Sequence, residues 1–277
     1  MDCSNKELKN ILLNILDKFI QTCKEYNLKY TLLGGSVLGA VRHGGIIPWD
    51  DDIDIGMPRS DYEKLLSIAD NVFNNDYKLT TIYNDKNYVC PFAKLFDNNT
   101  TLIESKEFFY IGGIYIDIFP LDGIPINSKL RFNIIRKLRY SITNYIFTKY
   151  SYSANDKKYS IKNLIQKIIY FITNITLKLC NRMARKYPYN NKYNIVNYFG
   201  AWRDKEISDY SWFNPLIEYT FEGRKVWIPN NYDAYLTKLY GNYMTPPPIE
   251  KRKSHHSHYF IDLTRRYTLD EIHKMGY

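Results

Sequence analysis

The sequence predicts an α+β fold, in which helices flank a mixed β-sheet and a basic helical insertion follows. Apolar residues alternate with strand period in several short segments, and they recur with helical period in longer ones. The order of these segments shows no strict strand–helix–strand repeat, which favours a mixed sheet over a parallel one. With 277 residues and 45% hydrophobic content, the chain can bury a sizeable core.

The chain divides into three parts by composition. Residues 1–127 form the predicted core, residues 128–189 are basic and helical, and residues 190–277 are expected to complete a cleft on the core. In the first part, helical spacing predicts helices over residues 5–28, 36–42 and 60–73. Strand patterns bounded by glycine, proline or other turn residues predict strands over residues 29–35, 52–57, 78–84, 89–96 and 112–125.

Two further helices are predicted over residues 129–150 and 161–186. From Ser128 to Tyr189 there are fourteen Lys or Arg residues against one Asp, a net charge of +13, so the remainder carries −4 of the total of +9. The longest weakly polar run, residues 164–177, is too short to span a bilayer and contains Lys167. After Pro188 the sequence is aromatic and rich in loop residues, and it ends in a short predicted helix.

These basic helices also have apolar faces, which leaves two interpretations. The faces pack on the body of the protein, or they lie on an anionic membrane surface. Nucleic acid is not the expected partner, because no recognition motif accompanies the charge. The predicted apolar positions are Phe132, Ile134, Ile135, Leu138, Leu164, Ile165, Ile168, Ile169, Phe171 and Ile172.

One acidic stretch, IIPWDDDIDIGM, places four aspartates within five positions, at Asp50, Asp51, Asp52 and Asp54. Two carboxylates about 6 Å apart repel by roughly 3 kcal/mol at an effective dielectric near 20, so something must offset this repulsion. In a strand, Asp50, Asp52 and Asp54 would share one face. Mg²⁺ prefers carboxylate oxygens, and Asp117, between two isoleucines on another predicted strand, is expected to add a third carboxylate.

Purely structural roles would also explain some of these aspartates. Asp50 and Asp51 follow Pro-Trp, where aspartates often form turns or caps, and a single strand-end aspartate such as Asp117 is common. An EF-hand does not fit, because glycine occupies position 56 where that loop requires it at 55.

A glycine-rich turn precedes the acidic stretch. Gly34, Gly35 and Ser36 lie where a predicted strand meets a predicted helix, so backbone N–H groups at the helix N-terminus could bind a phosphate. The turn is weak evidence alone, but the Asp52-x-Asp54 pattern follows shortly after it.

Together, Gly34–Gly35–Ser36, Asp52-x-Asp54 and Asp117 resemble the nucleotidyltransferase superfamily, which implies a nucleotidyltransferase-like fold. The segments GGSVLGAVRHGGIIPWDDDIDIGM, GIYIDIFPLDGIP and YDAYLTKLYGNYMTPPPIEKR resemble the LicD family of cholinephosphotransferases. Fukutin-related proteins share the first of these segments. The resemblance covers roughly residues 1–125 and 190–265.

The resemblance implies transfer of a phospho-alcohol, most often phosphocholine from CDP-choline, with release of CMP. The acceptor would be a hydroxyl of a cell-surface glycan, such as lipopolysaccharide or teichoic acid, or of its lipid-linked precursor. Asp52 and Asp54 would hold one or two Mg²⁺ ions, with Mn²⁺ as an alternative. Asp117 would be the catalytic base or a further metal ligand, and Gly35 and Ser36 would bind the donor phosphate.

Several other residues are candidates for the site. Arg42 could hold a diphosphate or pair with an aspartate, and Lys251 and Arg252 could fold over the donor phosphates or belong to a solvated tail. Lys94 is expected to reach solvent rather than the cleft. Further candidates are Asp50, His43 and Trp49, the last of which could stack or simply pack. Aromatic residues that could form a quaternary-ammonium cage or belong to the core are Trp202, Tyr210, Trp212 and Phe213.

Two other function classes stay open at this stage. The same fold could transfer the nucleotide itself to a small acceptor, or the protein could be a non-catalytic binder of membranes or polyanions. The four cysteines have no metal or disulfide spacing, and no signal peptide is recognised. We therefore expect a cytoplasmic protein, peripheral on the inner face of the cytoplasmic membrane.

Overall fold

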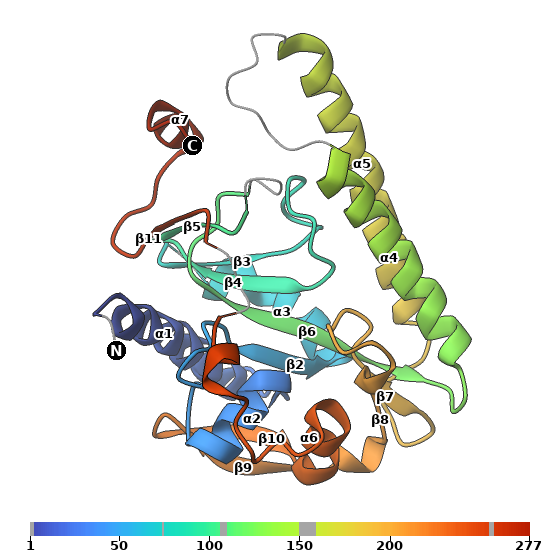
Figure 1. Ribbon diagram of the computed structural model, residues 1–277. Helices are drawn as coiled ribbons and strands as arrows, with labels where there is room; N and C mark the ends of the chain where they lie inside the picture. Colours follow the sequence, from blue (N-terminus) through green and yellow to red (C-terminus); the bar gives the residue numbers. More distant parts are fainter. Residues whose placement is uncertain (1–2, 74, 106–109, 150–158, 255–257) are drawn as a thin grey trace.

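A seven-stranded mixed sheet forms the centre of the structure (Figure 1), a computed structural model that describes residues 3–73, 75–105, 110–149, 159–254 and 258–277. Its main path runs β1-β2-β6-β4-β3, and β7 extends β6 and in turn pairs with β8. The strands of this sheet are β1 (Thr31–Leu32), β2 (Asp54–Pro58), β3 (Tyr77–Thr80), β4 (Ala93–Asp97), β6 (Tyr115–Ile124), β7 (Asn194–Val196) and β8 (Ile207–Ser208). Two smaller sheets pair β5 (Thr101–Ile103) with β11 (Phe260–Asp262), and β9 (Leu216–Phe221) with β10 (Arg224–Pro229).

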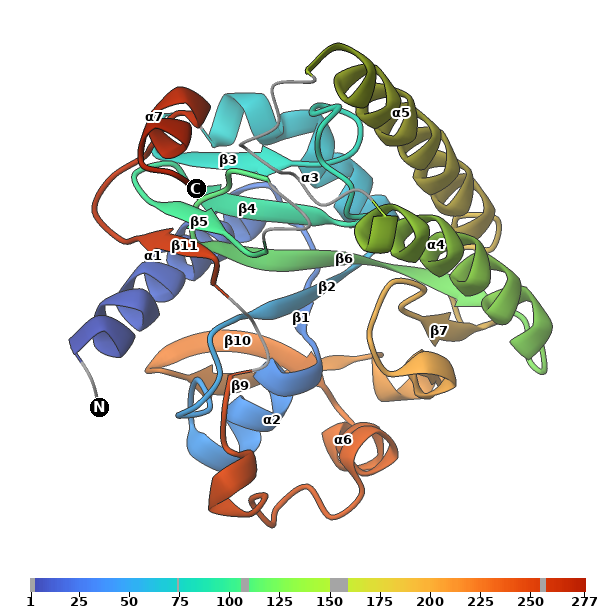
Figure 2. The ribbon, with the colours of Figure 1, turned by 45° about the horizontal axis from the view of Figure 1, so that its top comes forward.

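Helices surround this sheet. The α-helices are α1 (Cys3–Glu25), α2 (Gly34–His43), α3 (Arg59–Val72), α4 (Lys129–Lys149), α5 (Tyr159–Ala184), α6 (Tyr232–Tyr240) and α7 (Leu269–Lys274). Helices α1 and α3 contact the central strands and cover one face of the sheet, while α4 and α5 form a long antiparallel hairpin at its side (Figures 1 and 2). The apolar stripe of α1 is fully buried at Leu12, Leu16 and Phe19, as its helical spacing predicts.

The register of the central strands brings the acidic residues together. Strand β2 runs parallel to β6 with Asp54 opposite Asp117, and β4 runs antiparallel to β6 with Lys94 opposite Asp117. Because side chains alternate along a strand, Ile55 and Ile118 point to the other face, where both are fully buried. Apolar residues on one face thus anchor a row of charged residues on the other.

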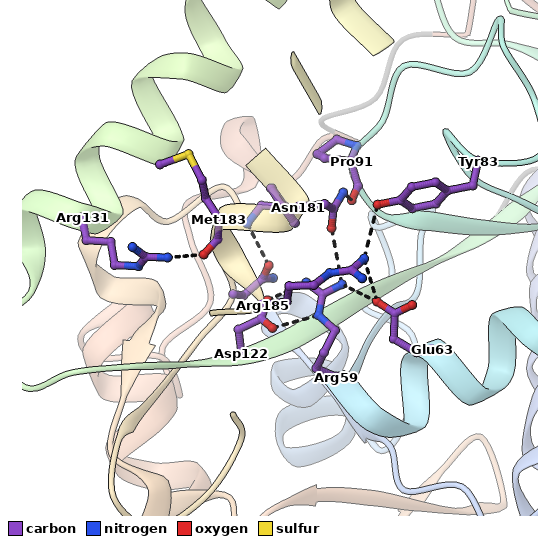
Figure 3. Close-up of polar contacts among 11 residues, drawn as sticks. Arg59, Glu63, Tyr83, Pro91, Asp122, Arg131, Asn181, Met183 and Arg185 are labelled. Carbon is purple, nitrogen blue, oxygen red and sulfur yellow. Dashed lines mark hydrogen bonds and ion pairs between the residues drawn. The ribbon is translucent and has the colours of Figure 1, made fainter. Parts of the chain in front are cut away.

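A buried ion-pair network attaches the helical hairpin to the core (Figure 3). Arg59, the first residue of α3, donates to both carboxylate oxygens of Asp122 on β6, at 2.8 and 2.6 Å, and Asp122 is 0% exposed. On α5, the Asn181 side chain lies 3.4 Å from Arg59 and donates to the Pro91 carbonyl at 3.0 Å. Directly after the end of α5, Arg185 pairs with Glu63 of α3 at 3.0 Å. The C-terminal half of α5 therefore has a defined position on the sheet.

The α+β fold class and the predicted helices are confirmed. Helices α1 to α5 and α7 lie where helical spacing predicted them, to within a few residues at each end. One detail of the acidic strand is wrong: β2 begins only at Asp54, so Asp50 and Asp52 lie in the irregular segment before it rather than on its face. The elements not predicted are β5, β7 to β11 and α6, which are short or lie in the aromatic C-terminal part.

In the part of the chain that the structure describes, no helix combines the length and the hydropathy needed to cross a membrane.

We expect Asp122→Asn to lower the free energy of unfolding by about 3–5 kcal/mol, because Arg59 would stay buried without its counter-ion. Denaturant unfolding measures this loss. The matched control is Asp204→Asn, which removes an exposed ion pair with Lys129 and should cost less than about 1 kcal/mol. Equal, small losses in both variants would contradict the structural role of the buried pair.

Candidate active site

A row of three charged side chains crosses adjacent strands at the centre of the site. Asp54 on β2, Asp117 on β6 and Lys94 on β4 are direct register partners. Like charges directly opposite each other destabilise a sheet, and here Lys94 offsets the pair, with its Nζ 3.2 Å from Asp117 Oδ1 and 3.1 Å from Glu104 Oε1. Burial alone would lower the pKa of Lys94, but Asp117, Tyr115 and Glu104 raise it well above its usual range.

This geometry corrects the expectation that Lys94 reaches solvent. Its side chain is 5% exposed, and its Nζ lies 3.2 Å from the centre of the Tyr115 ring. Alternation along β4 correctly predicted that Lys94 points to the sheet face opposite that of its apolar neighbours. It could not predict that this face carries the acidic row and is not open to solvent.

The N-terminus of α2 is the second part of the site. Gly34 has a positive φ of 47°, and its N–H donates to the hydroxyl of Tyr235 on α6 at 2.9 Å. A Cβ on Gly34 would lie 3.4 Å from the Asp54 carboxylate, and one on Gly35 would lie 3.0 Å from the Asp50 carboxylate. The glycines thus let two carboxylates approach the positive end of the helix dipole.

Ser36 joins this turn to the acidic strand. Its hydroxyl oxygen accepts the backbone N–H of Asp54 at 2.9 Å, and the Asp54 carbonyl accepts the N–H of Leu33 at 2.9 Å. The predicted phosphate-binding residues Gly35 and Ser36 therefore lie directly beside the predicted metal-binding residue Asp54.

Asp54 experiences the combined effect of the acidic residues. Burial raises the pKa of its carboxyl well above the usual range, and the charges of Asp52, Asp117, Asp50 and Glu206 raise it further. The helix N-terminus and Lys94 therefore offset only part of the repulsion.

An open cavity of about 230 Å³ lies in front of this row. Its acidic lining comes from Asp52, Asp54, Asp117 and Glu206, and α4 contributes Arg139 and Tyr140. Aromatic side chains complete the wall, namely Phe92, Phe119, Phe199, Trp202 and Tyr235. Of the four aromatic residues suggested for a cage, Trp202 lines this cavity, whereas Phe213 is buried and Trp212 lines a separate pocket.

Glu206 is an acidic member of the cavity that sequence patterns did not indicate. It is 8% exposed, and its Oε1 accepts the backbone N–H of Trp202 at 3.0 Å. Burial raises the pKa of Glu206 to about 7, against lowering effects from the Trp202 N–H and from Arg136, Arg139 and Lys238. Neither Glu206 nor Arg139 belongs to a recognisable motif, so only the tertiary structure identifies them.

Arg42 and Arg252 both lie close to the Trp49 ring. Their guanidinium carbons lie 6.0 and 5.3 Å from the centre of the Trp49 ring, and the His43 ring packs edge-on against it at 5.8 Å. Arg42 donates to the Tyr243 carbonyl at 2.6 Å, and Arg252 to the Pro247 carbonyl at 2.8 Å. Trp49 thus lies near two cations from distant parts of the chain.

Over the described residues, the Arg42 guanidinium donates to a backbone carbonyl and to the His43 ring, so its contacts favour neither diphosphate binding nor an aspartate bridge over the other. Burial lowers the pKa of Arg42, and the nearby charge of Arg252 lowers it further. Burial and the positive charge of Arg42 likewise lower the pKa of His43. Two guanidinium groups in such proximity favour an anion between or beside them.

The C-terminal segment folds back onto the acidic loop. The Ser254 hydroxyl donates to Asp51 at 2.7 Å, and His258 Nε2 lies 3.2 Å from the same carboxylate oxygen. Asp51 therefore holds this segment, while Lys251 is exposed in the short 3₁₀ turn before it. His255 and His256 lie outside the described residues.

The oxygen-rich lining suits a hard divalent cation such as Mg²⁺. Over the described residues, however, no three acidic, histidine or cysteine side chains converge closely enough to enclose a metal ion by themselves. Mg²⁺ usually takes one or two protein carboxylates and completes its octahedron with water and substrate phosphates. The carboxylates present fit that incomplete kind of site.

Comparison with known proteins agrees with this geometry. Residues 27–134 match the family described as LicD/FKTN/FKRP, nucleotidyltransferase domain. These residues include the α2 turn, the acidic loop and strands β2, β4 and β6.

One relative aligns over nearly its whole length. The lipopolysaccharide cholinephosphotransferase LicD of Haemophilus influenzae is 31% identical over 255 residues, which are 91% of this chain and 95% of that protein. Ribitol 5-phosphate transferase FKRP of Homo sapiens is 63% identical over 30 residues, 11% of this chain and 6% of FKRP. An uncharacterised protein of Rickettsia prowazekii is 60% identical over 35 residues, 13% of each chain. The chain therefore belongs to the LicD family of transferases.

Proposed function

We propose that this protein transfers phosphocholine from CDP-choline to a hydroxyl of a lipopolysaccharide or of a similar cell-surface glycan, and releases CMP. The observation that carries the proposal is the acidic row on β2 and β6 beside the N-terminus of α2, within a chain that aligns with a cholinephosphotransferase along its length. Phosphoryl transfer depends mainly on positioning and on neutralising charge, and both requirements suit this site.

In this proposal Asp52 and Asp54 hold Mg²⁺, or Mn²⁺ in its place, and Asp117 is a further ligand or the base that accepts the proton of the acceptor hydroxyl. The cation would neutralise charge on the bridging and leaving oxygens of the donor. The raised pKa of Asp54 supports the assignment, because clustered carboxylates of this kind are relieved by a bound cation.

The donor diphosphate would bind between the two positive features of the site. The Gly35 N–H lies at the start of α2, beside Ser36, whose own N–H donates to the Leu33 carbonyl at 2.9 Å. Arg42, near the C-terminal end of that helix, and Arg252 both lie near the Trp49 ring. Lys251 would add charge from the same segment as Arg252.

The choline group would occupy the aromatic and acidic part of the cavity. A quaternary ammonium binds favourably to aromatic faces, and Trp202, Phe199 and Tyr140 line the cavity near Glu206. The Glu206 carboxylate would add a negative charge opposite the trimethylammonium cation. This contact would need no hydrogen bond, because the carboxylate does not donate one and trimethylammonium cannot accept one.

The other function classes have less support. Membership of a transferase family and the presence of Asp52, Asp54 and Asp117 argue against a non-catalytic polyanion binder. Transfer of the nucleotide itself to a small acceptor uses similar phosphate chemistry and is distinguished by its products. A lipid-linked glycan acceptor would place the enzyme on the inner face of the cytoplasmic membrane.

Product analysis tests the reaction. With CDP-choline, Mg²⁺ and lipopolysaccharide lacking choline, we expect free CMP and phosphocholine on the glycan. Asp52→Asn should lower kcat by at least about 100-fold, because charge stabilisation at the reacting phosphate is lost. Asp70→Asn, on the exposed surface of α3, is the matched control. A nucleotidylated acceptor would support the second enzyme class, and full turnover by Asp52→Asn would refute the site.

The repulsion at Asp54 predicts an unusual effect on stability. The pKa of Asp54 is raised in the folded state, so its stabilising contribution is present below its ordinary value of 3.8 and is lost as the pH rises through the raised value. In metal-free protein at mildly alkaline pH, Asp54→Asn should therefore raise Tm by at least about 2 °C, and the gain should shrink in acid. An Asn variant that melts lower than the wild type at alkaline pH would contradict the repulsion.

The proposed choline subsite predicts a change in specificity. Glu206→Gln should raise KM for CDP-choline about tenfold but leave KM for CDP-glycerol nearly unchanged, because only choline carries a cation. Since the pKa of Glu206 is about 7, affinity for CDP-choline should increase as the pH rises through that value, and the Gln variant should lose this dependence. Glu218→Gln, on exposed β9, is the control. Equal effects on both donors would assign Glu206 a structural role.

A further inference from the structure

Over the described residues, the α4–α5 hairpin leaves one apolar face of α5 exposed. Helix α5 buries Thr173, Leu177, Cys180 and Ala184 toward the body, at intervals of four, three and four residues. The opposite side has large apolar residues that are 46–66% exposed, namely Ile168, Phe171, Ile172, Ile175 and Leu179. We call this set the outer α5 face; Leu164, Ile165 and Ile169, predicted to continue it, lie outside the described side chains.

The outer α5 face is a single surface stripe rather than scattered residues. Its members recur at helical intervals, so they occupy an arc of roughly 100° over about three turns. Apolar patches of this continuity on soluble chains mark sites of interaction. By contrast, the apolar residues predicted on α4 do not form one exposed face, because Phe132 and Ile135 are fully buried and Ile134 is 47% exposed.

The charge around this face is of one sign. The exposed Arg182 continues the stripe, and Lys178 lies exposed at its flank. Lys186, also exposed, follows in the turn after the end of α5. Neither α4 nor α5 contains an aspartate or glutamate anywhere in its sequence. An apolar stripe that continues into cations is complementary to anionic headgroups above an acyl layer, and it is poorly suited to a second copy, which would bring the same positive charge.

The hairpin also lines the site. Arg139 and Tyr140 of α4 border the cavity that contains the acidic row, and the Arg59–Asp122 network with Asn181 fixes α5 on the sheet. A bilayer against the outer α5 face would therefore lie at a fixed position relative to the cavity.

We propose that the outer α5 face, with Arg182 and Lys186, is a docking surface for an anionic membrane, on which α5 lies in the plane of the interface. Its use in catalysis rests on the lipid-linked acceptor proposed above, whereas docking itself can be measured without any substrate. The apolar residues would enter the boundary between headgroups and acyl chains, and the basic residues would contact lipid phosphates.

Co-sedimentation of the full chain with vesicles tests this proposal. We expect binding to vesicles of phosphatidylcholine mixed with phosphatidylglycerol, little binding to phosphatidylcholine alone, and weaker binding at high salt. The variant Phe171→Ser/Ile172→Ser/Ile175→Ser should reduce partitioning at least about tenfold, because these side chains supply the buried apolar area. Arg182→Gln/Lys186→Gln should remove most of the salt dependence.

Matched controls separate docking from folding and from the reaction. Trp227→Ser/Leu269→Ser removes two side chains that are 41% and 48% exposed elsewhere, and Lys6→Gln/Lys24→Gln makes the same charge change on α1. Both should bind vesicles like the wild type. Calorimetric titration of CDP-choline should give wild-type affinity in the triple Ser variant, which shows that its site is folded.

Three results would overturn the proposal. They are equal binding to vesicles with and without anionic lipid, wild-type partitioning of the triple Ser variant, and a dimer in light scattering that the triple Ser variant abolishes. The last result would assign the face to a second copy of the chain. If the wild-type protein does not bind CDP-choline, this result would instead count against the proposed reaction, and the conclusion about membrane docking would be unaffected.

Discussion

Repulsion among carboxylates is the constraint on which this site is built. Parallel pairing of β2 with β6 sets Asp54 opposite Asp117, and the irregular loop before β2 adds Asp50 and Asp52. The protein offsets part of the repulsion with Lys94 on the next strand and with the N-terminus of α2, which the carboxylates approach because Gly34 and Gly35 lack side chains. The uncompensated remainder makes the site attractive to a divalent cation and to the positive end of a choline donor.

The surrounding structure connects this charge cluster to two other surfaces. Trp49, in the acidic loop, lies near Arg42 of α2 and Arg252 of the C-terminal segment, which Asp51 holds in place. On the other side, the buried Arg59–Asp122 pair positions α5 and, through it, the hairpin whose α4 lines the cavity. Anions and cations are thus separated within the site, as the donor that we propose, with its diphosphate and quaternary ammonium, would require.

Local patterns predicted much of this structure, and tertiary contacts decided the rest. Helical spacing placed α1 to α5, and the alternation of Asp54 and Asp117 with isoleucines indicated that they share a sheet face. The pattern of β4 alone could not predict that Lys94 lies opposite Asp117 of β6, because the order of strands in a sheet is not a local property of the sequence. Glu206 and Arg139 reach the cavity from a 3₁₀ turn and from a helix whose charge pattern indicated only a basic surface. Strands β7, β8 and β11 have only two or three residues each, and β7 and β11 pair with strands distant in sequence, so their patterns were too weak to distinguish from loops. Strands β9 and β10 form a local hairpin of six-residue strands in the aromatic C-terminal part, and this hairpin was not predicted.

Calorimetric titration of CDP-choline with and without Mg²⁺ is the first measurement to make, because it shows whether the acidic row binds a CDP-alcohol together with a metal ion. CDP-ribitol and CDP-glycerol are the comparators, and Asp52→Asn is the variant. We expect tight binding of CDP-choline only with Mg²⁺, weaker binding of the two donors that carry uncharged alcohols, and loss of the Mg²⁺ effect in Asp52→Asn. Binding that is unaffected by Mg²⁺, or no binding of any donor, would contradict this expectation.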